Sequence, residues 1–75
     1  MKDSEFVYEV EDNMWTHDQT GWTIDGGTIF GLYNETIKAM FKRDTGLDIS
    51  SEMLDTMRDI TERLYYGKDN RNEQY

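Results

Sequence analysis

Carboxylates are the most abundant groups in this sequence that could carry chemistry. Glu11 follows an apolar segment with helical spacing, and Trp15 and Trp22 lie a few positions farther on. Desolvation of a carboxyl against an aromatic ring favours its protonated form, which a general acid requires. Asp18 and Asp25 lie in a polar loop, where a second carboxylate would stay ionised. Two carboxyls in such different surroundings are the minimum set for hydrolysing a glycosidic bond, so Glu11 is the candidate proton donor.

A glycine-rich run follows these carboxylates and could approach a ligand closely. The sequence Gly26-Gly27-Thr28-Ile29-Phe30-Gly31-Leu32-Tyr33 combines turn-forming glycines with a hydroxyl and two aromatic rings. No Lys-Ser or Lys-Thr pair follows, and acidic surroundings repel phosphate, so we expect no phosphate-binding loop. The run could instead be a hairpin turn leading into a helix, and a Trp in so small a protein is equally expected in the core. The candidates for substrate binding are Trp15, Trp22, Gly26, Gly27, Gly31 and Tyr33.

The charge of the chain is strongly negative and unevenly distributed. The 75 residues include 16 Asp and Glu against 8 Lys and Arg, a net charge of −8. Seven acidic residues and one basic residue lie in the first 30 positions, which is a net charge of −6. Phosphate contacts need clustered cations, so we expect no nucleic-acid partner. With one His and no Cys, the sequence predicts no metal site and no cofactor. The acidic end could be a solvated surface that aids solubility, or it could cover a basic groove on a partner.

Hydrophobic periodicity predicts three helices that position these groups. We expect them over residues 3–12, 35–45 and 51–66, with a glycine-rich loop or short β-hairpin over residues 13–31. Within that loop residues 22–24 and 28–30 resemble strands, and His17 is expected to be exposed. The predicted fold class is mainly α, with one domain over residues 1–67 and a polar tail over residues 68–75. The predicted core consists of Phe6, Val10, Ile37, Met40, Phe41, Leu54, Met57, Ile60 and Leu64.

The order of these residues resembles the start of phage-type lysozymes, most closely glycoside hydrolase family 108. That family has an N-terminal Glu-Gly-Gly, followed by an Asp-x-Gly-Gly-x-Thr-x-Tyr-Gly-Ile run. Glu11 stands where the family has its acid, although Asp12-Asn13 replace the two glycines. The resemblance implies that Glu11 protonates the leaving oxygen, that Asp25 steadies the developing positive charge and that Thr28 holds water. The residues that match the second run are Asp25, Gly26, Gly27, Thr28, Phe30, Gly31 and Leu32, and residues 60–66 are similar to a later segment.

A second alignment with phage lysozymes uses the polar loop instead. Asp18-Gln19-Thr20-Gly21-Trp22-Thr23-Ile24 resembles the Asp-x-x-Gly-x-x-Thr-Ile-Gly hairpin of the other large phage lysozyme family. In this register Glu11, Asp18 and Thr23 would form the catalytic trio. Both alignments imply a lysozyme-like lobe that cleaves β-1,4 glycan bonds of peptidoglycan.

The resemblance covers residues 5–66, whereas phage lysozymes continue into a second helical lobe that completes the sugar cleft. We therefore expect the missing lobe to come from a second protein chain or from a second copy of this one. No apolar run approaches the roughly 18 residues of a membrane span, and no signal-peptide core follows Met1. The expected location is the host cytoplasm or the virion, without contact with a membrane. The first hypothesis is a muramidase-like lobe; the alternative is a small acidic phage-type inhibitor that covers a basic surface of a host protein.

Overall fold

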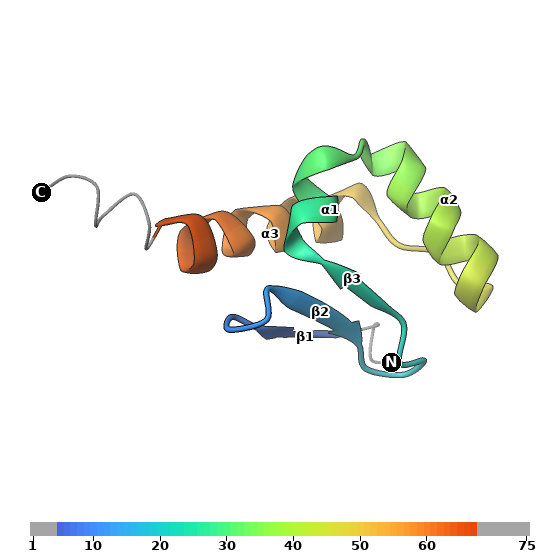
Figure 1. Ribbon diagram of the computed structural model, residues 1–75. Coiled ribbons are helices and arrows are strands. Elements are labelled where there is room, and N and C mark those ends of the chain that lie inside the picture. The colour runs from blue at the N-terminus through green and yellow to red at the C-terminus, as the bar shows by residue number, and fades with distance from the viewer. Residues whose placement is uncertain (1–4, 68–75) are drawn as a thin grey trace, which may run out of the picture.

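The computed structural model describes residues 5–67, which form a small antiparallel sheet followed by helices (Figure 1). The strands of this sheet are hydrogen-bonded in the order β1-β2-β3. The fold is therefore α+β, and the prediction of a mainly α protein is wrong. The predicted tail, residues 68–75, lies outside the described residues. Along the chain the elements are β1 (Phe6–Glu9), β2 (Met14–His17), β3 (Thr23–Asp25), α1 (Gly26–Gly31), α2 (Asn34–Thr45), α3 (Ser51–Thr61) and the π-helical turn η1 (Glu62–Tyr66).

Strand β1 and a turn occupy the positions where a first helix was predicted. That prediction, over residues 3–12, is wrong for residues 5–12, and residues 3 and 4 lie outside the described part of the chain. Half-buried and exposed side chains alternate along Phe6–Glu9, which is the period of a strand. Phe6 and Tyr8 lie opposite His17 and Trp15 in the antiparallel pair with β2. Packing between these cross-strand aromatic pairs outweighs the helical spacing that the apolar residues also satisfy.

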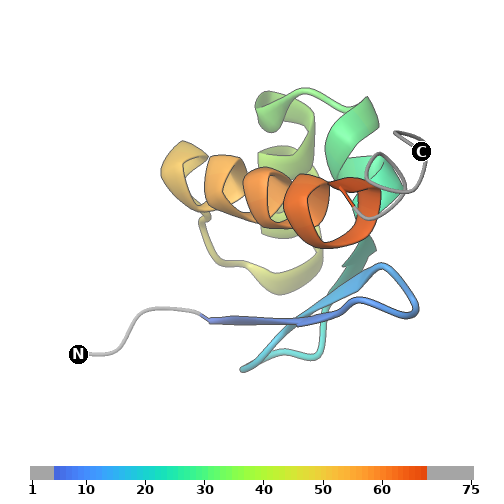
Figure 2. The same cartoon turned by 90° about the vertical axis from the view of Figure 1, so that its left-hand side faces the viewer.

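The sheet has one face against the helices and one open face. On the central strand β2, Trp15 lies between Tyr8 of β1 and Ile24 of β3, and all three side chains pack into the core. The next row across the sheet is Glu9, Met14 and Asp25, and its side chains point to the opposite face because successive residues alternate. Figure 2 shows the helices on one side of the sheet, with the other side uncovered by the described residues.

The two helices predicted in the second half of the chain are confirmed. Helix α2 ends at Gly46, which has a left-handed φ of 78° and whose N–H bonds to the carbonyl of Lys42. The side chain of Ser50 accepts a hydrogen bond from the N–H of Met53 and so caps α3. The side chain of Asp25 caps α1 in the same way. Residues 28–30 are therefore helical, and the strand predicted there is wrong.

The core lies between the buried sheet face and the helices. Phe41 of α2 is completely buried, and its ring centroid lies 4.9 Å from that of Trp22 and 5.0 Å from that of His17. Leu64 was predicted in the core but is 46% exposed, on η1. Val10 and Met40 are half-buried outside the core. The buried apolar residues are Trp15, Ile24, Ile29, Ile37, Phe41, Ile49, Leu54 and Met57, with Phe6 and Ile60 packed against them.

Arg58 links the helices through one guanidinium group. Its Nε and Nη2 atoms donate to the carbonyl of Ile29 at 3.2 and 3.1 Å, near the end of α1. Its Nη2 atom also donates to Oδ1 of Asn34 at 2.7 Å, at the start of α2. A carbonyl at a helix end has no partner within its own helix, so these bonds from α3 hold the short helix α1 in place.

Candidate functional site

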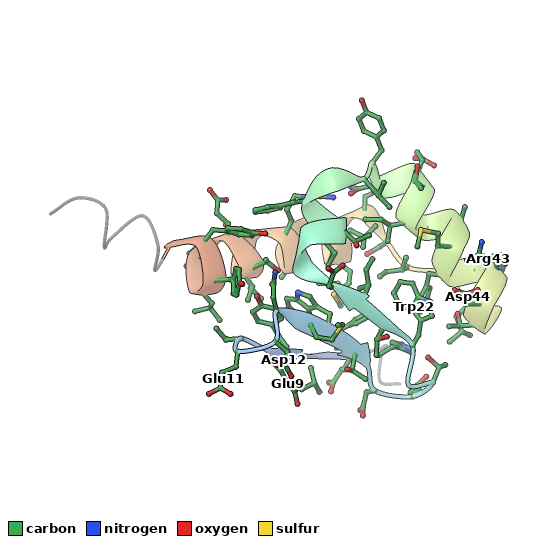
Figure 3. All side chains as sticks on the ribbon, in the orientation of Figure 1. Glu9, Glu11, Asp12, Trp22, Arg43 and Asp44 are labelled. Atoms are coloured by element: carbon green, nitrogen blue, oxygen red, sulfur yellow. The ribbon has the colours of Figure 1, made fainter. Side chains whose placement is uncertain are left out.

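Glu11 lies at the tip of the β1–β2 hairpin rather than at the end of a helix. The turn is closed by a 3.1 Å hydrogen bond from the N–H of Asn13 to the carbonyl of Val10. Asn13 has a left-handed φ of 54°, a conformation that Asn tolerates better than most residues. Glu11 and Asp12 are exposed, and together with Glu9 and Val10 they line an open hollow of about 410 Å³. Figure 3 shows the three carboxylate side chains at this end of the sheet. The glycosidase hypothesis required Glu11 to be desolvated against an indole ring, and this turn leaves its side chain in solvent.

The other candidate carboxylates lie at different ends of the sheet. Asp18 follows β2 and Glu11 precedes it, so a four-residue strand separates them, roughly 13 Å at about 3.3 Å per residue. Asp25 lies beside Met14 on β3, at the same end of the sheet as Glu11. The structure therefore places Asp25, but not Asp18, near the hairpin that carries Glu11.

The two candidate threonines occupy different environments. The N–H and hydroxyl groups of Thr28 both donate to Oδ1 of Asp25, so these two side chains form the cap of α1. Thr23 lies opposite Thr16 on the open face of the sheet and is exposed. Thr28 is thus engaged in capping, whereas the Thr23 side chain is open to solvent.

The two tryptophans have different surroundings. Trp15 is 4% exposed; its ring stacks on Tyr8 at 4.5 Å, and its Nε1 atom donates to Oγ1 of Thr61 at 2.8 Å. Burial raises the pKa of the Tyr8 phenol above its usual value, so this group stays a donor and bonds to Oδ1 of Asn13. These contacts give Trp15 a place in the core rather than on a sugar-binding surface.

Trp22 is half-buried and lies at the opposite end of the sheet from Glu11 (Figure 3). Its Nε1 atom donates to Oδ2 of Asp44 at 2.9 Å, and Nε of Arg43 donates to Oδ1 of the same carboxylate at 2.9 Å. The hydrogen bond from Arg43, followed by that from Trp22, holds the pKa of Asp44 below its usual value. The structure therefore separates Trp22 from the hairpin tip, although the sequence grouped it with Glu11.

The candidate glycines and Tyr33 do not form one binding loop. Gly26 is buried, and a Cβ atom built on it would lie 2.7 Å from Cγ2 of Thr61. Gly27 and Gly31 are exposed, and a Cβ atom on Gly31 would meet no atom within 4 Å. Tyr33 is 84% exposed at the start of α2. Gly26 is thus required for packing of the sheet against α3, a role that the sequence analysis did not assign to it.

His17 is completely buried, although it was predicted to be exposed in a loop. Its Nδ1 atom lies 2.8 Å from Oγ1 of Thr20, and Nε2 has no hydrogen-bond partner among the described residues. Its ring lies 4.9 Å from that of Phe6 and 5.0 Å from that of Phe41. In the sequence, His17 lies two residues after Trp15, and alternate residues of a strand point to the same face. This spacing was the sequence signal that His17 is buried beside Trp15.

The open face of the sheet is a site that sequence reasoning missed. Its centre is made of Val7, Met14, Thr16 and Thr23, which share alternate positions on the three strands. Val7 is 54% exposed. Carboxylates lie at both ends of this face and on the adjoining hairpin tip. We call this surface the acidic sheet face; it consists of Glu5, Val7, Glu9, Met14, Thr16, Asp18, Thr23 and Asp25, together with Glu11 and Asp12 at the tip.

Cations are absent from the part of the sequence that builds this face. Residues 5–37 contain no Lys or Arg. On the helices and the loop after α2, by contrast, four cations form ion pairs: Lys42 with Asp48, Arg43 with Asp44, Arg58 with Asp55 and Arg63 with Asp59. Glu9, Glu11 and Asp12 form no ion pair within residues 5–67, so negative charge gathers without a paired cation at the hairpin end of this face.

Residues 5–67 hold no group of three or more His, Asp or Glu side chains arranged to bind a metal ion. No helix in the described range is long and apolar enough to cross a bilayer. Comparison of the chain with protein-family models, with curated proteins and with solved structures finds no match.

Proposed function

We propose that this protein is a small acidic binding protein that covers a basic surface of a partner protein with its acidic sheet face. The observation that carries the proposal is the composition of that face: exposed or half-buried apolar and threonine side chains in the centre, carboxylates around them and no Lys or Arg in residues 5–37. Protein interfaces commonly have an apolar centre within a polar rim. The helices cover the opposite side of the sheet, and none of the residues 5–67 covers this face (Figure 2).

In such a complex, electrostatic attraction orients the partner and increases the rate of association. A cluster of like charges without local counter-charges produces a field that steers an oppositely charged partner toward it. The carboxylates of Glu9, Glu11 and Asp12 lie together at one end of the face (Figure 3). Four carboxylates on the helices and the loop after α2 are each paired with a cation, so they attract a basic partner less strongly than this end of the face does.

The first test compares two triple variants with equal net charge. Glu9→Gln/Glu11→Gln/Asp12→Asn and Glu35→Gln/Glu52→Gln/Glu62→Gln both change the net charge of −8 to −5, the first on the acidic sheet face and the second on helices. The probe is cytochrome c, a basic folded protein, titrated at low and physiological salt. We expect the sheet-face variant to bind about tenfold more weakly, since each exposed ion pair contributes about 0.2–1 kcal/mol. The helix variant should change affinity less than about twofold.

Two results would contradict the proposal. Equal weakening by both variants would show that net charge acts without a defined surface. Unchanged affinity of the sheet-face variant would show that the basic protein does not bind at the acidic sheet face. Far-UV circular dichroism of all three proteins controls for folding, because Glu35 and Glu52 lie in the first turns of α2 and α3, where a carboxylate stabilises a helix.

The glycosidase hypothesis stays a prediction of the sequence. What supports it is that Glu11 and Asp25 lie at the same end of the sheet. If it holds, the protein with its natural partner clears purified cell wall in a zymogram, and Glu11→Gln lowers this activity at least about a hundredfold, because general acid catalysis contributes about 10²–10⁴. Glu35→Gln is the control and should keep full activity. A fully active Glu11→Gln protein would eliminate the hypothesis.

A further inference from the structure

Strand β1 leaves one edge of the sheet unpaired. In the order β1-β2-β3, β1 pairs with β2 on one side, and no other described strand lies on its other side. The N–H of Asp18 donates to the carbonyl of Glu5 at 2.8 Å, so the backbone groups of Glu5 face β2. Hydrogen-bonding directions alternate along an antiparallel strand, so the N–H and C=O groups of Phe6 and Tyr8 point to the open edge.

Although β1 is short, with four residues, its edge lacks three of the features that commonly prevent strand addition. Natural edge strands are often protected by Pro, Lys or a β-bulge. The β1 sequence Phe-Val-Tyr-Glu contains neither Pro nor Lys. Its four residues pair with β2 in uninterrupted register, from Phe6 opposite His17 to Glu9 opposite Met14, so no bulge distorts the strand. The backbone groups of β1 are therefore positioned to pair with a further strand.

Charge decides which strand can occupy the edge. Pairing two copies of β1 would bring together two acidic sheet faces, and neither copy has a Lys or Arg in residues 5–37. Like charges on neighbouring strands are destabilising, whereas opposite charges on paired strands contribute favourably. A second copy is thus disfavoured, and a strand with cations on the outer side complements the face.

We propose that the β1 edge binds an extended basic segment of the partner by adding it to the sheet as a fourth strand. Every second residue of that segment is Lys or Arg and lies on the outer side, near Glu9 and the hairpin tip. The intervening Val or Thr residues lie opposite Phe6 and Tyr8 and pair with their backbone groups. This proposal rests on the proposed function and specifies how the partner is held: backbone pairing supplies the fixed geometry, and the carboxylates select the charge.

The test uses the full chain and two labelled peptides of identical charge. The first is acetyl-Lys-Thr-Lys-Val-Lys-Thr-Lys-amide; the second has the same sequence with N-methyl groups on its Thr and Val residues. N-methylation keeps every cation but removes the N–H donors that would face β1. We expect the methylated peptide to bind at least tenfold more weakly in fluorescence anisotropy. We also expect the unmethylated peptide to slow hydrogen exchange of the Phe6 and Tyr8 amides at least tenfold in NMR spectra.

The outcomes separate this inference from the proposed function. Equal binding of both peptides, with unchanged exchange at Phe6 and Tyr8, would overturn strand addition, whereas the proposed function would still be judged by the two triple variants. Slowed exchange at both amides without peptide, together with a dimer in sedimentation equilibrium, would show that a second copy occupies the edge and would also overturn the inference. Loss of peptide binding in the Glu9→Gln/Glu11→Gln/Asp12→Asn protein, but not in the helix variant, is the supporting result.

Discussion

Replacement of Gly26 by Ala is expected to destabilise the protein by about 1–3 kcal/mol, the usual cost of overpacking a well-filled site. A Cβ atom at this position would overlap Oδ1 of Asn13 and lie 2.7 Å from both Cγ of Asn13 and Cγ2 of Thr61. Neither neighbour is free to move. Oδ1 of Asn13 accepts a 2.6 Å hydrogen bond from Tyr8, and Oγ1 of Thr61 accepts a 2.8 Å bond from Trp15. Urea unfolding followed by tryptophan fluorescence measures the loss.

Gly31→Ala is the matched control for Gly26→Ala. No atom lies within 4 Å of a Cβ built on Gly31, and its backbone is not left-handed, so Ala should be neutral or stabilising by up to about 1 kcal/mol. In an Asn13→Gly/Thr61→Ser background the overlapping atoms are removed, and Gly26→Ala should then cost less. If Gly26→Ala were as harmless as Gly31→Ala, the hairpin would not pack against α3 as described.

Replacement of Phe41 by Ala is expected to have the largest effect on stability, about 3–5 kcal/mol. Phe41 is completely buried, and its ring contacts those of Phe6, His17 and Trp22. It therefore packs α2 against β1, against β2 and against the segment that connects β2 to β3. Native proteins are stable by only about 5–15 kcal/mol, so this loss removes a large share of the stability and should lower the melting temperature markedly. Thermal unfolding followed by circular dichroism measures the effect, and Phe41→Leu provides a milder variant.

Leu64→Ala is the control for Phe41→Ala. The sequence placed Leu64 in the core, where its loss would cost about 2–5 kcal/mol. At 46% exposure the side chain loses much less contact, and we expect a cost below about 1 kcal/mol. A loss for Leu64→Ala as large as that for Phe41→Ala would show that η1 packs more closely than the structure indicates.

The candidate site was predictable in its residue types but not in its arrangement. The excess of acid in the first 30 residues is visible in the sequence, and so is the stop signal at Gly46. Glu11 and Trp22 were grouped because they are close in sequence, yet strand β2 and its turns place them at opposite ends of the sheet (Figure 3). The spacing of Asp18 and Asp25 likewise gives no indication of which one lies beside the hairpin tip, because this depends on strand register.

The sequence by itself determined the helical second half and the negative charge, because helix caps and periodicity are local properties. Ser50, Gly46 and the apolar stripe of α3 act within a few residues of one another. The tertiary structure alone decided that Phe6–Glu9 is a strand, that His17 is buried and that the carboxylates share one open face. These features depend on pairing between residues that are distant along the chain. The hydrophobic pattern of a short segment is compatible with either a helix or a strand until such a partner is present.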